Sequence, residues 1–184
     1  MKKKQIITLF LLLYGAVISA QTKEEIIKSM IEEVTYLASD ELEGRATGTD
    51  SEKLAADFIG QKFLEYNLQE KGDKDYLQFF TATIKDNPHS QQIKRKIEGI
   101  NVVGFKDNNK EETIIIGGHY DHLGYGGDGS LYRDSIKAIH NGADDNASGT
   151  AVMLDLARKL KNKNTNNNYL FIAFSGEEMG LLGS

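Results

Sequence analysis

Apolar side chains recur three and four positions apart in three segments of the chain, the spacing of an amphipathic helix: residues 22–37, 49–66 and 147–160. The first two begin with a threonine that is followed three residues later by a glutamate, a pair typical of helix N-termini: Thr22 with Glu25, and Thr49 with Glu52. We therefore expect three helices, each with one buried face.

Four other segments have the composition of strands. Residues 76–84 and 100–105 are rich in aromatic and β-branched side chains, and the polar, basic stretch 89–96 between them is typical of a loop or hairpin tip. Residues 113–118 and 169–174 are continuous apolar runs, as in strands buried on both faces. These two runs enclose the third predicted helix, so they should be the parallel strands of a βαβ unit. The predicted fold class is α/β, with a mixed, largely parallel central sheet flanked by helices.

The start of the chain has the pattern of a secretory signal peptide. Three lysines at positions 2–4 precede an apolar run, residues 6–18, that leads to Ala20. The alternative is a membrane anchor, but Thr8, Tyr14 and Gly15 interrupt a run that should be about 20 residues long. We expect cleavage after Ala20, export to the periplasm or the exterior, and no stable membrane insertion of the mature domain, residues 21–184.

Composition narrows the classes of partner. Removing residues 1–20 takes away three of the 22 basic residues and none of the 27 acidic ones, and leaves a net charge of −8. Such a surface argues against nucleic acid as a partner. The chain has no cysteine, which excludes disulfides and cysteine-ligated zinc. Its length suits one domain with a sizeable core.

Ionisable clusters follow both predicted buried strands. Residues 117–122 read Gly-Gly-His-Tyr-Asp-His, and residues 175–178 read Ser-Gly-Glu-Glu. A third cluster, Asn-Gly-Ala-Asp-Asp-Asn-Ala-Ser-Gly at 141–149, leads into the crossover helix. Ligands of open α/β sheets bind beyond the carboxyl ends of the strands. We expect the three clusters to meet at that edge.

Crowded carboxylates need a compensating positive charge, and none of the three clusters contains lysine or arginine. A divalent cation would supply that charge, and histidine with carboxylates suits zinc or a similar metal better than calcium or magnesium. Taken singly, an Asp-Asp-Asn run is more often a turn or helix cap, and a Glu-Glu pair a solvated helix start. The prediction of a metal site therefore depends on all three clusters lying together.

Spacing suggests individual roles at this site. His119 and Asp121 are alternate residues, so in an extended segment their side chains point the same way and the carboxylate can orient the imidazole. Glu177 and Glu178 are adjacent, so one can bind metal while the other acts as general base. The other histidines are interpreted as ordinary polar residues: His89, His122 and His140.

Residues 117–122, 141–149 and 174–184 resemble the co-catalytic zinc aminopeptidases of peptidase family M28, as does the segment 37–45, Leu-Ala-Ser-Asp-Glu-Leu-Glu-Gly-Arg. The resemblance implies two zinc ions and hydrolysis of peptide or protein substrates by a zinc-activated water. It also implies a role for each site residue, with Asp144 left unassigned: His119 and Glu178 each bind one zinc, Asp145 bridges both, Asp121 orients His119, and Glu177 is the general base.

One departure from the family and two alternatives accompany this interpretation. The family's metal shells include a further aspartate and histidine downstream of the Glu-Glu pair, whereas the chain ends at Ser184. We therefore expect a catalytic domain that is incomplete at its C-terminus, with little zinc binding or activity in the chain alone.

The same motifs would also serve a zinc carboxypeptidase or a glutaminyl cyclase. A non-catalytic binding domain is disfavoured, because each ligand expected before residue 184 is present.

Overall fold

The computed structural model of the protein describes residues 23–85, 93–126, 130–160 and 166–184. Its helices are α2 (Lys23–Leu37), α3 (Asp50–Glu65) and α4 (Gly149–Leu160), with two short helical turns, η1 (Asp40–Leu42) and η2 (Ala143–Ser148). Its strands are β1 (Gln69–Glu70), β2 (Leu77–Lys85), β3 (Ile93–Lys106), β4 (Thr113–His119) and β5 (Asn168–Phe174). The predicted helices and strands are therefore confirmed, and the second strand extends further back than residues 100–105.

The sheet has the order β1-β3-β5-β4, with β2 also paired to β3. The predicted α/β class and mixed sheet are confirmed, and β4 and β5 are parallel as expected. The sheet is less parallel than predicted, because the other pairings among the described strands are antiparallel. Two consecutive strands, β2 and β3, pair as antiparallel neighbours, and β3 then joins the βαβ unit against β5.

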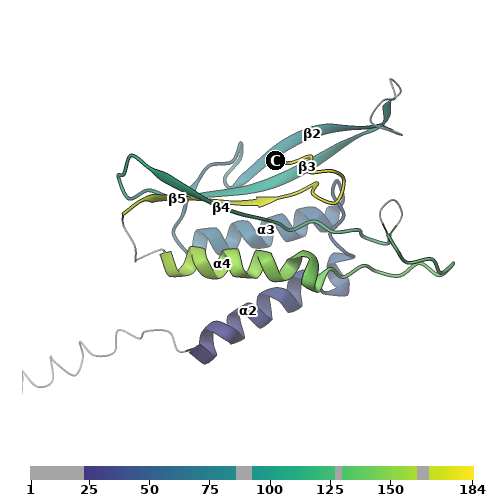
Figure 1. Ribbon diagram of the computed structural model, residues 1–184, viewed down its shortest axis with the longest axis horizontal. Helices are drawn as coiled ribbons and strands as arrows, with labels where there is room; N and C mark the ends of the chain where they lie inside the picture. Colours follow the sequence, from purple (N-terminus) through teal and green to yellow (C-terminus); the bar gives the residue numbers. More distant parts are fainter. Residues whose placement is uncertain (1–22, 86–92, 127–129, 161–165) are drawn as a thin grey trace, which may run out of the picture.

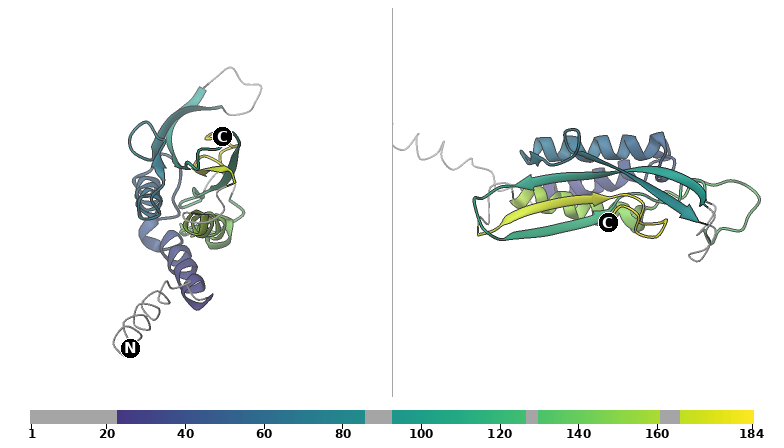
Figure 2. Two further views of the ribbon diagram at one scale, coloured as in Figure 1. Left: turned by 90° about the vertical axis from the view of Figure 1, so that its left-hand side faces the viewer. Right: turned by 90° about the horizontal axis from the view of Figure 1, so that it is seen from above.

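The described helices lie on one side of the sheet, with α3 and α4 next to it and α2 further away (Figures 1 and 2). The expectation that residues 113–118 are buried on both faces is therefore wrong: Ile115 is 64% exposed and Ile114 is 43% exposed. This strand, β4, lies at the edge of the sheet, and in the described part of the chain no helix covers its second face. The inner strand β5 is more deeply buried.

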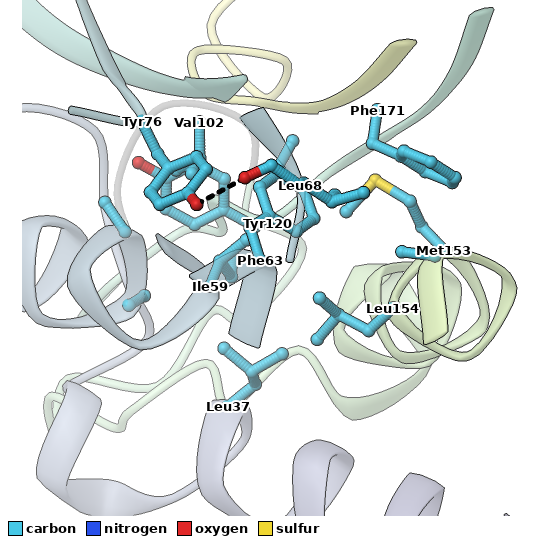
Figure 3. Packing of buried hydrophobic residues seen from close by; sticks show 14 of the residues in the cluster. Leu37, Ile59, Phe63, Leu68, Tyr76, Val102, Tyr120, Met153, Leu154 and Phe171 are labelled. Carbon is cyan, nitrogen blue, oxygen red and sulfur yellow. Dashed lines mark hydrogen bonds between the residues drawn. The ribbon is translucent and has the colours of Figure 1, made fainter. Parts of the chain in front are cut away.

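The core fills the space between the helices and the sheet (Figure 3). Phe63 of α3 lies at its centre, with its ring centroid 6.0 Å from that of Tyr76 and 6.3 Å from that of Phe171. Leu154 of α4 and Val102 of β3 are also fully buried. Each such side chain stabilises the fold by about 1.5–3 kcal/mol relative to an exposed position. The core fixes the βαβ unit, which carries the ionisable clusters, against α3.

The start of α3 connects the helix layer to the sheet. The Thr49 side chain accepts a hydrogen bond from the Glu52 amide at 3.2 Å, which confirms the predicted helix start. The Glu52 carboxylate does not return to Thr49 but accepts from the amides of Gly48 at 2.7 Å and Ile100 at 3.0 Å. This buried carboxylate therefore links α3 to β3. The other predicted cap, Thr22, lies outside the described residues.

The predicted signal peptide, residues 1–20, also lies outside the described residues. Among the helices that the structure describes, none is long and apolar enough to cross a membrane.

Candidate active site

The three ionisable clusters meet at the carboxyl edge of β4 and β5, as the sequence predicts. The two strands are parallel and in register at their ends, where His119 pairs with Phe174. The third cluster is joined to the end of β4 through the His119 carbonyl, which accepts hydrogen bonds from the Asn146 amide group at 3.2 Å and the Thr150 hydroxyl at 2.9 Å. The loops that follow both strands and the turn that precedes α4 therefore form one site.

The His119 imidazole faces two of the predicted acidic residues. Its Nε2 atom lies 3.1 Å from Oδ1 of Asp145 and 3.8 Å from Oε2 of Glu177. The His119 side chain is 15% exposed, whereas those of Asp145 and Glu177 are 68% and 37% exposed. A half-buried imidazole thus stands beside carboxylates that solvent or a ligand can reach.

Glu178 lies next to His122, a histidine that the sequence interpretation treated as an ordinary polar residue. The His122 Nδ1 atom is 2.5 Å from Oε1 of Glu178. Ligand atoms of His122, Asp145 and Glu178 all lie within 4.8 Å of one another. The signal for His122 is its position three residues after His119, just beyond the end of a strand. Sequence periodicity could not place its ring, because residues after the strand follow no regular spacing.

Asp121 is fully buried beneath the site. One of its carboxylate oxygens lies 3.6 Å from Nδ1 of His119, beyond hydrogen-bond distance, and the Asp121 main-chain oxygen is closer at 3.3 Å. The carboxylate accepts hydrogen bonds from the amides of Glu177 at 3.2 Å and Glu178 at 3.4 Å, and from the Thr47 hydroxyl at 2.9 Å. Asp121 therefore contacts both strand-end loops, although its predicted orienting effect on His119 stays a prediction.

The carboxylates also influence the charge of His119. Burial by itself lowers the pKa of this imidazole, but Asp121, Glu177 and Asp145 together raise the pKa above its usual value. These neighbours stabilise a positive charge at the ring, because opposite charges within a few ångströms favour the ionised form. The same carboxylates would favour the binding of a cation at this site.

Arg45 is a site residue whose role sequence reasoning missed. Its side chain is fully buried, and its guanidinium donates to the carbonyls of Leu37, Tyr120, Asn141 and Gly142. Burial lowers the pKa of Arg45 to about 10, while Asp121, Asp145 and Glu178 oppose that shift. The guanidinium remains charged at neutral pH. Arg45, which lies outside the three clusters, therefore supplies part of the positive charge that the sequence alone suggests a metal must supply.

Two glycines are required by the turns that carry the site. Gly142 has φ of 58°, and a Cβ there would lie 2.6 Å from both the Asp145 carbonyl oxygen and the His122 ring. Gly176 has φ of 74°, a region that other residues rarely adopt. Both angles lie in the left-handed region, which glycine adopts without steric cost, so the two turns that carry the site suit glycine. Asp144, by contrast, has an exposed side chain, and its main-chain oxygen accepts from the Ser148 hydroxyl.

The donor set fits a divalent metal. Imidazole nitrogens of His119 and His122 lie close to carboxylate oxygens of Asp145, and Glu178 belongs to the same group of donors. Such a mixture of imidazole and carboxylate ligands is typical of zinc and similar ions.

Comparison with known proteins shows which family residues 101–184 resemble. Residues 101–184 match the model of Peptidase family M28. The alkaline phosphatase isozyme conversion protein of Escherichia coli K12 is 35% identical over 145 residues, which cover 77% of this chain and 40% of that protein. Aminopeptidase YwaD of Bacillus subtilis is 35% identical over 103 residues, which cover 56% of this chain and 19% of that protein. The chain thus spans less than half the length of either relative.

Solved structures support the same fold. A Zn-dependent exopeptidase from Parabacteroides distasonis superposes with a TM-score of 0.61 at 20% identity, over 82% of this chain and 47% of that one. The Tannerella forsythia glutaminyl cyclase superposes with a TM-score of 0.63 at 19% identity, over 81% of this chain and 46% of that one. The shared α/β fold, the clusters gathered at its sheet edge and the match over residues 101–184 agree with one another: residues 101–184 of this chain are similar to peptidase family M28.

Proposed function

We propose that the protein is a zinc-dependent exopeptidase, with aminopeptidase activity, that hydrolyses peptide bonds near a chain terminus. The observation that carries the proposal is that Asp145 is close to both sets of donors: its Oδ1 lies 3.1 Å from Nε2 of His119, and it has an oxygen within 4.8 Å of ligand atoms of His122 and Glu178. Sequence relatives named as an aminopeptidase and as probable leucine aminopeptidases support this choice of activity.

Two zinc ions are part of the proposal. His119 would hold one ion and Glu178 the other, with Asp145 shared between them. His122 lies close enough to Glu178 either to orient that carboxylate or to add a ligand. When bound, the ions would supply Lewis-acid polarisation of the scissile carbonyl.

Glu177 is assigned the proton transfers. Its carboxylate points toward the same region as the His119 ring and is partly exposed, so a water molecule can reach it. In hydrolysis, Glu177 accepts a proton as the water oxygen bonds to the carbonyl carbon, and returns that proton to the amine as the C–N bond breaks. The hydrogen bond from its amide to Asp121 fixes the main chain from which this side chain extends.

The activity can be tested with the protein expressed from its full gene. We expect turnover of aminoacyl-p-nitroanilides, loss of turnover after EDTA treatment and recovery on addition of zinc. Peptides with a blocked N-terminus and free C-terminus test for carboxypeptidase activity, and peptides with N-terminal glutamine test for cyclisation. Undiminished turnover after verified removal of the metal, or activity confined to either alternative substrate, would contradict the proposal.

Export is a separate proposal, based on the lysines and the apolar run in residues 1–20. We expect the mature protein to begin at or near Gln21 and to be recovered from the periplasm or the medium. N-terminal sequencing of the native protein checks this. Retention of Met1 on a protein found only in the cytoplasm would refute it.

A further inference from the structure

Thr47 lies in the segment between η1 and α3, away from the three clusters in sequence but directly beneath them in the fold. Its side chain is buried, with only 4% of the residue exposed. The hydroxyl donates to Oδ2 of Asp121 at 2.9 Å and accepts from the amide of Gly176 at 3.1 Å. One hydroxyl therefore connects the loop that follows β4 to the loop that follows β5.

A second buried group fixes the position of Thr47. The Ser175 hydroxyl lies 3.3 Å from the Thr47 hydroxyl and makes a shorter hydrogen bond to Glu52. Because a serine hydroxyl has one proton, the shorter contact takes it, and Thr47 is left free to donate its own proton to Asp121. The Glu52 carboxylate in turn accepts hydrogen bonds from the Gly48 and Ile100 amides. The Thr47 hydroxyl therefore belongs to a buried hydrogen-bonded network that includes Ser175 and Glu52.

Asp121 connects Thr47 to the loop that carries Glu177 and Glu178. The carboxylate that receives the Thr47 hydrogen bond also receives those of the Glu177 and Glu178 amides. A fully buried carboxylate depends on such donors, because its desolvation cost is otherwise not offset. Thr47 supplies one of these donors from its side chain.

We propose that Thr47 is a positioning residue for the metal and proton-transfer site. Through Asp121 it fixes the main chain of Glu177 and Glu178, and so the direction in which their carboxylates extend. This inference rests on the proposed zinc peptidase function, because it assigns Thr47 a task in that site. The side chain itself touches neither substrate nor metal.

The test compares three variants of the protein expressed from its full gene. Thr47→Val keeps the shape and removes the hydroxyl, and Thr47→Ser restores the hydroxyl. Thr49→Val makes the same change two residues away, where the hydroxyl caps α3 and does not reach the site. Zinc affinity is measured by competition with a chromophoric chelator, thermal unfolding is recorded in parallel, and kcat and KM are measured on an aminoacyl-p-nitroanilide.

We expect Thr47→Val to weaken zinc binding about 10- to 100-fold, the usual effect of losing a support behind a metal ligand. Its kcat should fall more than its KM changes, and Thr47→Ser should restore both zinc affinity and kcat to within about threefold. Thr49→Val should lower the unfolding temperature through loss of the helix cap but leave zinc affinity unchanged.

Each result bears on a different claim. Equal losses of zinc affinity in Thr47→Val and Thr49→Val, or normal zinc affinity and kcat in Thr47→Val, would overturn the role of Thr47. Failure of the unaltered protein to bind zinc would instead overturn the proposed function. If Thr47→Val does not fold, Thr47→Ala removes the hydroxyl without adding a group in its place, and its zinc affinity decides the question.

Discussion

Replacing Glu177 with glutamine is expected to lower kcat by about 100-fold or more while zinc remains bound. Glutamine preserves the size of the side chain and the hydrogen bond from its main-chain amide to Asp121, but it cannot accept a proton. General acid–base catalysis typically contributes roughly 10²–10⁴-fold to the reaction rate, so its loss should lower kcat by a factor of this size. The measurement is kcat on an aminoacyl-p-nitroanilide together with zinc content of the purified variant, both in the protein expressed from its full gene.

Glu178→Gln is the matched control, because it makes the same chemical change at the adjacent position. Glu178 faces Asp145 and His122, so this variant should lose zinc affinity by at least the roughly 10- to 100-fold typical of changes behind the metal ligands. Added zinc should then recover part of its activity, whereas added zinc should not help Glu177→Gln. Equal zinc loss in the two variants would show that their roles are wrongly assigned.

Arg45→Met is expected to destabilise the protein by about 3–5 kcal/mol, since buried hydrogen-bonding groups are left without their partner. The guanidinium donates to four main-chain carbonyls from the end of α2, the end of β4 and the turn before α4. Methionine fills much of the same space but donates no hydrogen bond. Against a typical total stability of 5–15 kcal/mol, this loss is large and is measurable by urea unfolding.

Two further variants test the cause of that loss. Arg133→Met makes the same change at an exposed residue that donates to the Ser130 carbonyl, and its effect should stay within about 0.5 kcal/mol. Arg45→Lys keeps the charge but presents a compact ammonium group instead of a planar fork, so it should be intermediate. A stability of Arg45→Met equal to that of the unaltered protein would show that the buried guanidinium does not hold these segments together.

Arg45 also changes the electrostatic argument for a metal. The sequence contains no cation within the three clusters, which by itself suggests that a divalent ion supplies all of the compensating charge. The structure places one guanidinium close enough to influence Asp121, Asp145 and Glu178. One buried cation against these acids still leaves negative charge in excess, so the donor set remains suited to a metal.

The local sequence pattern was sufficient to predict much of the frame of the site. Thr49 with its apolar helix period predicted the start of α3, and the apolar runs at 113–118 and 169–174 predicted two parallel strands. Because parallel strands end at the same edge of a sheet, the positions of His119 and Glu177 along the chain were enough to predict their proximity.

Other features depend on contacts that no local pattern encodes. Residues 113–118 have the composition of a strand buried on both faces, yet Ile115 is largely exposed, because strand order placed β4 at an edge. The polar residues at the start of β3, such as Arg95 and Lys96, form part of the strand because β2 pairs with them, although their composition indicates a loop. In both cases the neighbouring strand, rather than the segment itself, decides the outcome.

The sequence by itself determined the α/β class, the three ionisable clusters and their common sheet edge. These follow from the residue pattern of each segment and from the order of strand, helix and strand along the chain. Only the tertiary structure decided which side chains face one another there. The His122 contact to Glu178 spans 56 residues, and the contacts from Arg45 to Tyr120 and from Thr47 to Asp121 span 75 and 74 residues. Such pairs are set by how the helices pack on the sheet and how the loops close, because burial forces each polar group to find a partner wherever the fold brings one within reach.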